Sequence, residues 1–130
     1  MKKTVLIVED ELDMRIFLTT LLETSGYRPI MTRNGSEGML KAREISPDLI
    51  ILDVMMPGEG GVQMYRQLKT DTNLCNIPVI MLSAVTRKTF AHYLNMVNAR
   101  LKDAIPDPDA YIEKPPEAEE LLKMTTALIG

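Results

Sequence analysis

The apolar residues of this chain fall into short runs that alternate with longer stretches in which apolar residues recur every three or four positions. Most of the short runs are almost wholly apolar and rich in β-branched residues, which is typical of strands buried on both faces of a parallel sheet. They predict strands at residues 4–8, 28–32, 49–53, 77–82 and 110–113. The run at 28–32 is less apolar than the others, so we expect it at an edge of the sheet.

The stretches between these runs predict five helices. We expect them over about 12–25, from about Ser36 to Ser46, over 62–70 after a flexible loop at 58–61, around 90–101, and over 117–129. The fourth should be the longest, at about 16 to 18 residues. Apolar residues expected along the first two helices are Met14, Phe17, Leu18, Leu21, Leu22, Met39, Leu40 and Ala42. Five strand–helix units in sequence imply one parallel sheet with right-handed crossovers and helices on both faces.

Length, composition and net charge limit the number of domains and the kinds of partner. At 130 residues, with 45% apolar and 25% charged residues, the chain is expected to be a single domain over residues 1–130. A net charge of −3 argues against direct nucleic-acid binding, which depends on Lys and Arg. No signal or membrane segment is evident, so we expect a cytoplasmic protein with no membrane partner. The single cysteine, Cys75, is expected in a loop with no redox or metal role.

Several polar residues stand where the predicted strands end: Glu9, Asp10, Asp53, Ser83 and Lys114. The carboxyl ends of parallel strands meet at one edge of a sheet, which is where ligands bind in open α/β folds. Singly, Asp10 or Asp53 could be a helix cap or turn residue, Ser83 a helix N-cap, and Lys114 a solvated lysine. Together they predict a site at this edge.

Clustered carboxylates need a proton or a cation between them. Two carboxylates about 4 Å apart repel by roughly 4 kcal/mol at an effective dielectric constant near 20. Mg²⁺ suits such a site because it takes oxygen ligands; we expect Asp10 and Asp53 as direct ligands and Glu9 to act through water. With its charge offset in this way, Asp53 can act as a nucleophile towards phosphorus. Ser83 and Lys114 can then contact phosphoryl oxygens.

Four segments carry a resemblance to a known family. They are Val8-Glu9-Asp10-Glu11, residues 52–58, Leu82-Ser83-Ala84 and Tyr111-Ile112-Glu113-Lys114-Pro115. They resemble the signature segments of the receiver domain of two-component response regulators, here of the stand-alone type, and they span the chain in the family's order. The resemblance implies a flavodoxin-like fold with strand order 2-1-3-4-5 and a cis Lys114–Pro115 peptide bond.

The resemblance also implies a function in phosphorelay signal transduction. Asp53 would accept a phosphoryl group from the phosphohistidine of a histidine kinase or a phosphotransfer protein. Mg²⁺ would be held by Glu9, Asp10, Asp53 and the backbone carbonyl of Met55. Ser83 and Tyr111 would form a switch pair that alters the face made by the fourth helix, the fifth strand and the fifth helix, where an output protein binds. Such a protein is not an enzyme in the ordinary sense.

Two features depart from the family pattern. The 30 residues between Ser83 and Lys114 exceed the usual number, and residues 105–109 replace the customary Gly-Ala, so we expect an enlarged fourth helix and following loop. Met55 and Val85, where the family tunes hydrolysis, are both apolar. We expect neither to position water well, so the phosphorylated form should persist.

Two other functions remain open at this stage. One is a Mg²⁺-dependent phosphatase or phosphotransferase with an aspartyl-phosphate intermediate. The haloacid-dehalogenase type of such enzymes needs a second acid two residues after the nucleophile, where this chain has Met55. The other is a protein-binding module that works without phosphorylation.

Overall fold

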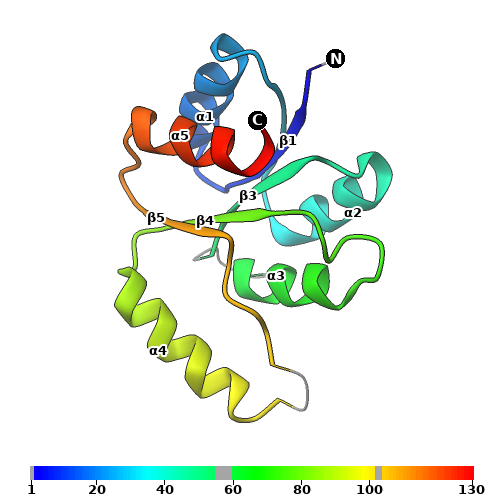
Figure 1. Ribbon diagram of the computed structural model, residues 1–130, viewed down its shortest axis with the longest axis vertical. Coiled ribbons are helices and arrows are strands. Elements are labelled where there is room, and N and C mark those ends of the chain that lie inside the picture. Colours follow the sequence, from blue (N-terminus) through cyan, green and yellow to red (C-terminus); the bar gives the residue numbers. More distant parts are fainter. Residues whose placement is uncertain (1, 55–59, 102–103) are drawn as a thin grey trace.

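The computed structural model describes residues 2–54, 60–101 and 104–130, and within them strands and helices alternate along the chain (Figure 1). The strands are β1 (Thr4–Val8), β2 (Arg28–Thr32), β3 (Leu49–Asp53), β4 (Val79–Ser83) and β5 (Ala110–Glu113). The helices are α1 (Leu12–Thr24), α2 (Gly35–Ile45), α3 (Gly61–Thr70), α4 (Arg87–Asn98) and α5 (Ala118–Ile129). Among the described residues, no helix is both long and apolar enough to cross a membrane.

The five strands form one parallel sheet in the order β2-β1-β3-β4-β5. Side chains alternate across it, because successive residues of a strand point to opposite faces. On one face Leu6 and Leu52 pack with residues of α2, α3 and α4, and on the other Ile7 and Ile51 pack with residues of α1 and α5. The predicted flavodoxin-like fold, its strand order and the edge position of β2 are therefore confirmed.

The strand predicted at 77–82 starts two residues before the observed strand. β4 begins at Val79. Pro78 has no N–H to donate to the sheet, although its carbonyl accepts a hydrogen bond from Ile50 N at 3.1 Å. The backbone N–H and carbonyl of Val79 bond to Asp109, which joins the starts of β4 and β5.

Two of the expected apolar helix residues point to water. Phe17 is 37% exposed and Leu40 is 68% exposed, whereas their neighbours Leu18 and Met39 are buried. Adjacent helical residues are about 100° apart around the axis, so a one-residue offset takes a side chain off the buried face. α2 begins at Gly35, one residue before the expected start, and its N-cap is Asn34, whose side chain accepts the backbone N–H of Glu37.

The fourth helix is not enlarged. α4 has 12 residues, and α1 with 13 is longer than α4. The additional length lies in the segment after α4, where the Asn98 side chain bonds to both the N–H and the carbonyl of Ile105. Ile105 is buried in the core, and the carbonyl of Pro106 accepts the Tyr65 hydroxyl at 2.8 Å. A side-chain amide thus binds the backbone beyond the helix end, which stops the helix and turns the chain back towards β5.

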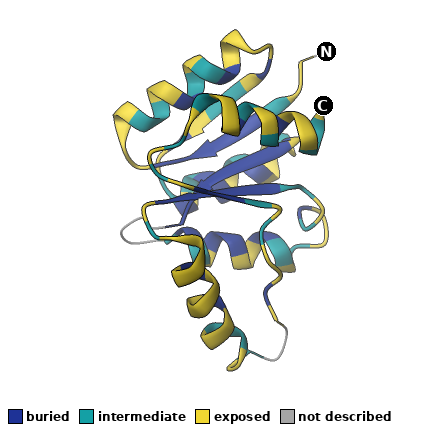
Figure 2. Ribbon diagram, turned by 60° about the vertical axis from the view of Figure 1, so that its left-hand side comes forward, coloured by how far each residue is buried: buried dark blue, intermediate teal, exposed yellow. Residues whose placement is uncertain are grey.

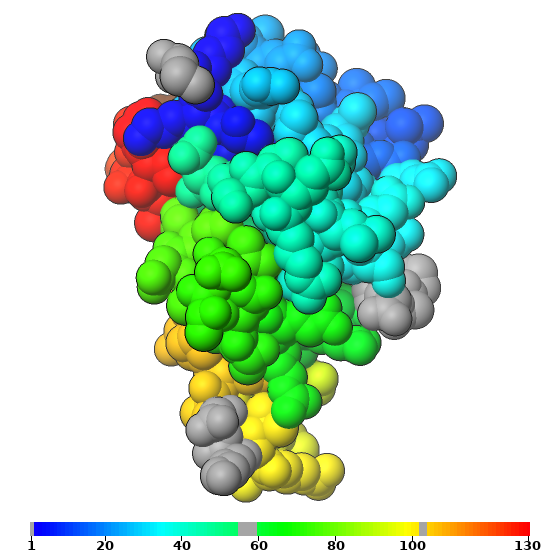
Figure 3. Space-filling view, turned by 90° about the vertical axis from the view of Figure 1, so that its right-hand side faces the viewer, coloured from blue at the N-terminus to red at the C-terminus, as the bar shows by residue number. Residues whose placement is uncertain are grey.

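α4 projects from the body of the molecule, with much of its surface exposed (Figure 2). In the view over α2 and α3, the end of α4 and the segment after it form the narrow tip of the molecule (Figure 3).

Candidate functional site

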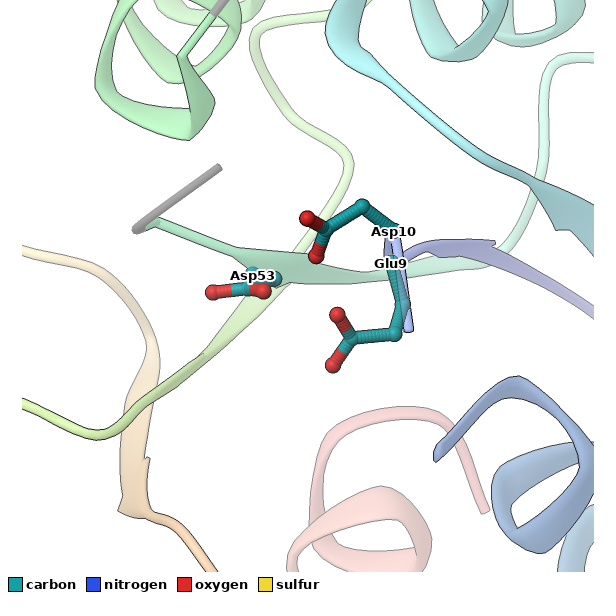
Figure 4. A group of neighbouring side chains, drawn as sticks. All are labelled: Glu9, Asp10 and Asp53. Atoms are coloured by element: carbon teal, nitrogen blue, oxygen red, sulfur yellow. The ribbon is translucent and has the colours of Figure 1, made fainter. Parts of the chain in front are cut away.

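The predicted site residues meet at the carboxyl edge of the sheet. Asp53 is the last residue of β3, and Glu9 and Asp10 follow β1 directly. Carboxylate oxygens of these three residues lie within 4.8 Å of one another (Figure 4). Glu9 and Asp53 are buried at 1% and 3% exposure, whereas Asp10 is exposed. The cluster is therefore open to solvent on the side of Asp10.

Lys114, which follows β5, lies among these acids. Its Nζ is 3.1 Å from Asp53 Oδ2, 2.6 Å from Glu9 Oε1 and 3.0 Å from Glu11 Oε1. The Lys114–Pro115 peptide bond is cis, as the family resemblance implied. The contact with Glu11 was not predicted from the sequence. The feature that could have revealed it is that Glu11 is a third acid just after β1, two residues beyond Glu9.

Burial and proximity perturb two groups in this cluster. Burial and a hydrogen bond with Asp53 outweigh the attraction of Lys114 and raise the pKa of Glu9 to about 8. Burial alone would lower the pKa of Lys114, but its contacts with Glu9, Glu11 and Asp53 prevail and raise it. Without a cation at the cluster, Glu9 is therefore protonated at neutral pH while Lys114 stays charged.

The donor set fits a hard divalent cation. Three carboxylates supply oxygen ligands, which Mg²⁺ and Ca²⁺ prefer. Glu9 Oε1 is enclosed by protein, and its 2.6 Å contact with Lys114 Nζ is poorly directed for a hydrogen bond, so among the described residues this oxygen is held by charge alone. Met55, whose carbonyl was expected to complete the set, lies outside the described residues.

The backbone around the acids is held by residues that the sequence did not single out. Nη1 of Arg15 donates to the carbonyls of both Glu9 and Asp10 at 2.9 Å, which fixes the turn between β1 and α1. The predicted flexible loop at 58–61 is wrong at its end, because Gly61 is already the first residue of α3. A Cβ at Gly61 would lie 2.1 Å from the Asp53 carbonyl oxygen, so this glycine allows α3 to start against the site.

Ser83, the last residue of β4, and Tyr111 of β5 both bond to Val85. Ser83 is fully buried, and its Oγ accepts the N–H of Val85 at 3.0 Å. The Tyr111 side chain is buried, and its hydroxyl donates to the Val85 carbonyl at 2.6 Å. Burial raises the pKa of Tyr111, while a hydrogen bond with Ser83 opposes the rise. The cap of α4 is Thr86, not Ser83, which leaves the Ser83 hydroxyl outside any capping role.

Comparisons with known proteins agree on one family. Residues 5–126 match the family model described as "Response regulator receiver domain". The chain is 37% identical to the polar-differentiation response regulator DivK of Brucella anthropi, over 100% of this chain and 98% of that protein. It is 36% identical to DivK of Brucella ovis over the same shares.

Solved structures are similar along almost the whole chain. The signal receiver domain of a histidine kinase from Syntrophus aciditrophicus is 31% identical, with a TM-score of 0.82, over 98% of this chain and 89% of that one. The chemotaxis protein CheY4 of Vibrio cholerae has a TM-score of 0.84 at 24% identity, over 98% and 99%, and supports the fold alone.

Proposed function

Because the chain belongs to the family of response regulator receiver domains, we propose that Asp53 accepts a phosphoryl group from the phosphohistidine of a sensor histidine kinase or a phosphotransfer protein. Family membership also decides against the first of the two alternative functions that the sequence left open, the phosphatase. The chain is a receiver domain in two-component signalling, not a phosphatase of the haloacid-dehalogenase type.

The observation that carries the proposal is the surroundings of the Asp53 carboxylate. It lies at the carboxyl edge of the sheet, with the Lys114 ammonium 3.1 Å from Oδ2 and oxygens of Glu9 and Asp10 within 4.8 Å. Phosphoryl transfer depends mainly on positioning and on neutralising charge. A fixed ammonium beside the acceptor oxygen and acids able to hold a cation provide both.

In the proposed reaction, an Asp53 oxygen attacks phosphorus, the phosphorus–nitrogen bond of the donor breaks and a phosphorus–oxygen bond to Asp53 forms. Glu9, Asp10 and Asp53 would hold Mg²⁺, which when bound neutralises charge on the phosphoryl oxygens. Lys114 keeps its charge beside Asp53 and pairs with a phosphoryl oxygen. Glu9 gives up the proton that it carries in the metal-free protein.

Ser83 and Tyr111 are proposed to transmit the effect of Asp53 phosphorylation to the surface of the protein. A phosphoryl group on Asp53 would draw the Ser83 hydroxyl away from the N–H of Val85, to which it is bonded. Val85 would then be free to shift, and its carbonyl accepts the Tyr111 hydroxyl. Rearrangement of Val85 would alter the face formed by α4, β5 and α5, where an output protein would bind. This is a local electrostatic event that biases a two-state element.

The test is incubation with acetyl phosphate and Mg²⁺, followed by intact-mass measurement. We expect the mass to increase by one phosphate, and this gain to be lost in Asp53→Asn and on chelation of the metal. Asp13→Asn, an exposed acid in the first turn of α1, is the matched control and should be phosphorylated normally. Failure to gain phosphate from either acetyl phosphate or a phosphohistidine donor would instead favour a binding module that works without phosphorylation.

A further inference from the structure

An apolar groove separates the start of α3 from α4, on the flank of α4 that faces α3. It is lined chiefly by Val54, Val62, Val85, Phe90 and Tyr93, and its volume is about 350 Å³. We call it the α3–α4 groove. A second hollow of about 320 Å³ also includes Tyr93 and continues along α4, past Met96, Val97, Arg100 and Leu101.

Two large apolar side chains along this path remain in water. Tyr93 is 47% exposed and Met96 is 54% exposed. Thr89, Tyr93 and Met96 recur at four- and three-residue intervals, which places them on one flank of α4, and Arg100, two residues after the helix ends, lines the same hollow as Met96. The flank is therefore a continuous strip about as long as α4, roughly 18 Å at 1.5 Å per residue, rather than a set of scattered exposed residues.

The two helices beside the groove are basic, although the protein as a whole is acidic. The chain has 18 acidic against 15 basic residues, yet residues 61–70 and 87–101 include no Asp or Glu. Their Lys and Arg residues are Arg66, Lys69, Arg87, Lys88 and Arg100. Arg66 is exposed one turn after Val62, and Arg100 lines the far hollow. An apolar groove thus lies between positively charged rims.

We propose that the α3–α4 groove binds one amphipathic helix of a partner protein, with an apolar stripe in the groove and acidic residues towards Arg66 and Arg100. The elongated apolar hollow fits the helix-in-groove mode, in which side chains at helical spacing are the anchors. The positive rims select acidic flanks by charge complementarity. Helical spacing puts Arg87, which bonds to the Tyr111 carbonyl, on the opposite flank of α4 from Tyr93, so the groove opens away from β5, although Val85 lines the groove and also bonds to the Tyr111 hydroxyl.

The proposal does not rest on phosphorylation of Asp53, so it is tested with the unphosphorylated protein. The probe is a displayed library of helical peptides about four turns long with randomised surface positions. The peptides enriched on the wild-type chain are then measured individually by fluorescence anisotropy, and one is mapped on the protein by amide chemical-shift changes. We expect the enriched peptides to combine an apolar stripe with acidic flanks and to shift the amides of Val62, Val85 and Tyr93.

Variants locate the binding site. Tyr93→Ser and Arg100→Glu should each weaken binding by about tenfold or more, as loss of a central anchor or reversal of a rim charge does. Met31→Ser and Arg28→Glu, which alter an exposed apolar and an exposed basic residue on β2 at the far edge of the sheet, should leave affinity unchanged.

The proposal is overturned if no helical peptide is enriched, if basic peptides bind as well as acidic ones, or if the shifted amides lie on another face. It is equally overturned if sedimentation shows a dimer that Tyr93→Ser abolishes, because a second copy of the chain would then occupy the groove. Normal phosphorylation of Tyr93→Ser would show that loss of peptide binding is not loss of the Asp53 chemistry.

Discussion

At the scale of single residues, the site is governed by how three acids and one lysine share a small volume. Lys114 contacts two buried acids, Glu9 and Asp53, so one positive charge would have to balance two negative ones if both acids were ionised. The pKa of Glu9 rises to about 8 because burial and Asp53 disfavour a second buried negative charge. In the metal-free protein the proton on Glu9 thus lowers the negative charge of the cluster, as a bound cation would.

This proton makes the stability of the metal-free protein depend on pH. The folded protein retains the proton of Glu9 up to about pH 8, whereas the ordinary pKa is 4.5. The stabilisation is therefore complete below pH 4.5 and declines as pH rises towards 8, by at most about 1.4 kcal/mol per pH unit. In Glu9→Gln this decline should disappear from urea unfolding curves measured without divalent metal. Glu23→Gln, an exposed acid of α1, should keep it; equal pH dependence in both variants would contradict the prediction.

Gly61 sets how closely α3 approaches Asp53. Gly61→Ala would place a Cβ 2.1 Å from the Asp53 carbonyl oxygen, and backbone atoms cannot yield as a flexible side chain can. We expect the variant to lose about 1 to 3 kcal/mol of unfolding free energy and to be phosphorylated more slowly by acetyl phosphate. Gln63→Ala, at an exposed position of the same helix, should change neither. If Gly61→Ala has the wild-type unfolding free energy and phosphorylation rate, the site does not depend on how closely α3 approaches Asp53.

We expect Val85 to affect how long a phosphoryl group remains on Asp53. It lines an apolar groove and offers no side-chain hydrogen bond to an attacking water. After removal of acetyl phosphate, intact-mass time courses should show the phosphorylated form lasting well beyond seconds, and Val85→Asn should lose phosphate faster. Loss within seconds in the wild-type chain would refute this expectation.

At the scale of elements, the segment from α4 to β5 is the part of the fold that departs most from expectation. The helix ends at Asn98 and a turn follows at residues 99–100, and the Asn98 amide bonds to the Ile105 backbone at 2.7 and 3.0 Å. Buried Ile105 and the Tyr65–Pro106 hydrogen bond join the segment to the core. These contacts, rather than helix length, set where α4 ends and which of its flanks remain exposed.

Asn98→Ala would remove both hydrogen bonds to Ile105 and leave its backbone groups without those partners. We expect a loss of about 1 to 3 kcal/mol of unfolding free energy and faster amide hydrogen exchange around Ile105. Asn95→Ala, one turn earlier at an exposed position, is the control. If Asn98→Ala exchanges no faster than the control, the amide does not hold the segment.

At the scale of the whole molecule, a bound cation would join β1 to β3 through their end residues and so stabilise the fold. A ligand that binds only the folded state adds about 2.7 kcal/mol at a concentration 100 times its dissociation constant. Mg²⁺ should therefore raise the apparent melting temperature, and Asp10→Asn should reduce the rise. Asp13→Asn should show the wild-type rise; a rise unaffected by Asp10→Asn would place the cation elsewhere.

The sequence by itself determined the sheet, the alternation of elements and the membership of the acidic cluster. Unbroken apolar runs fix strands buried on both faces, and a parallel sheet must bring Glu9, Asp53 and Lys114 to one edge whatever the detailed packing. The residues that carry the proposed chemistry could therefore be named before any coordinates were known.

Only the tertiary structure decided the contacts between segments that local pattern cannot relate. It showed that Gly61 lies against Asp53, that Glu11 joins Lys114, and that Asn98 ends α4 by binding Ile105. It also showed that Phe17 and Leu40 face water and that a groove with basic rims lies beside α4. These features depend on distances between atoms far apart along the chain, whereas periodicity reports only which face of its own element a residue occupies.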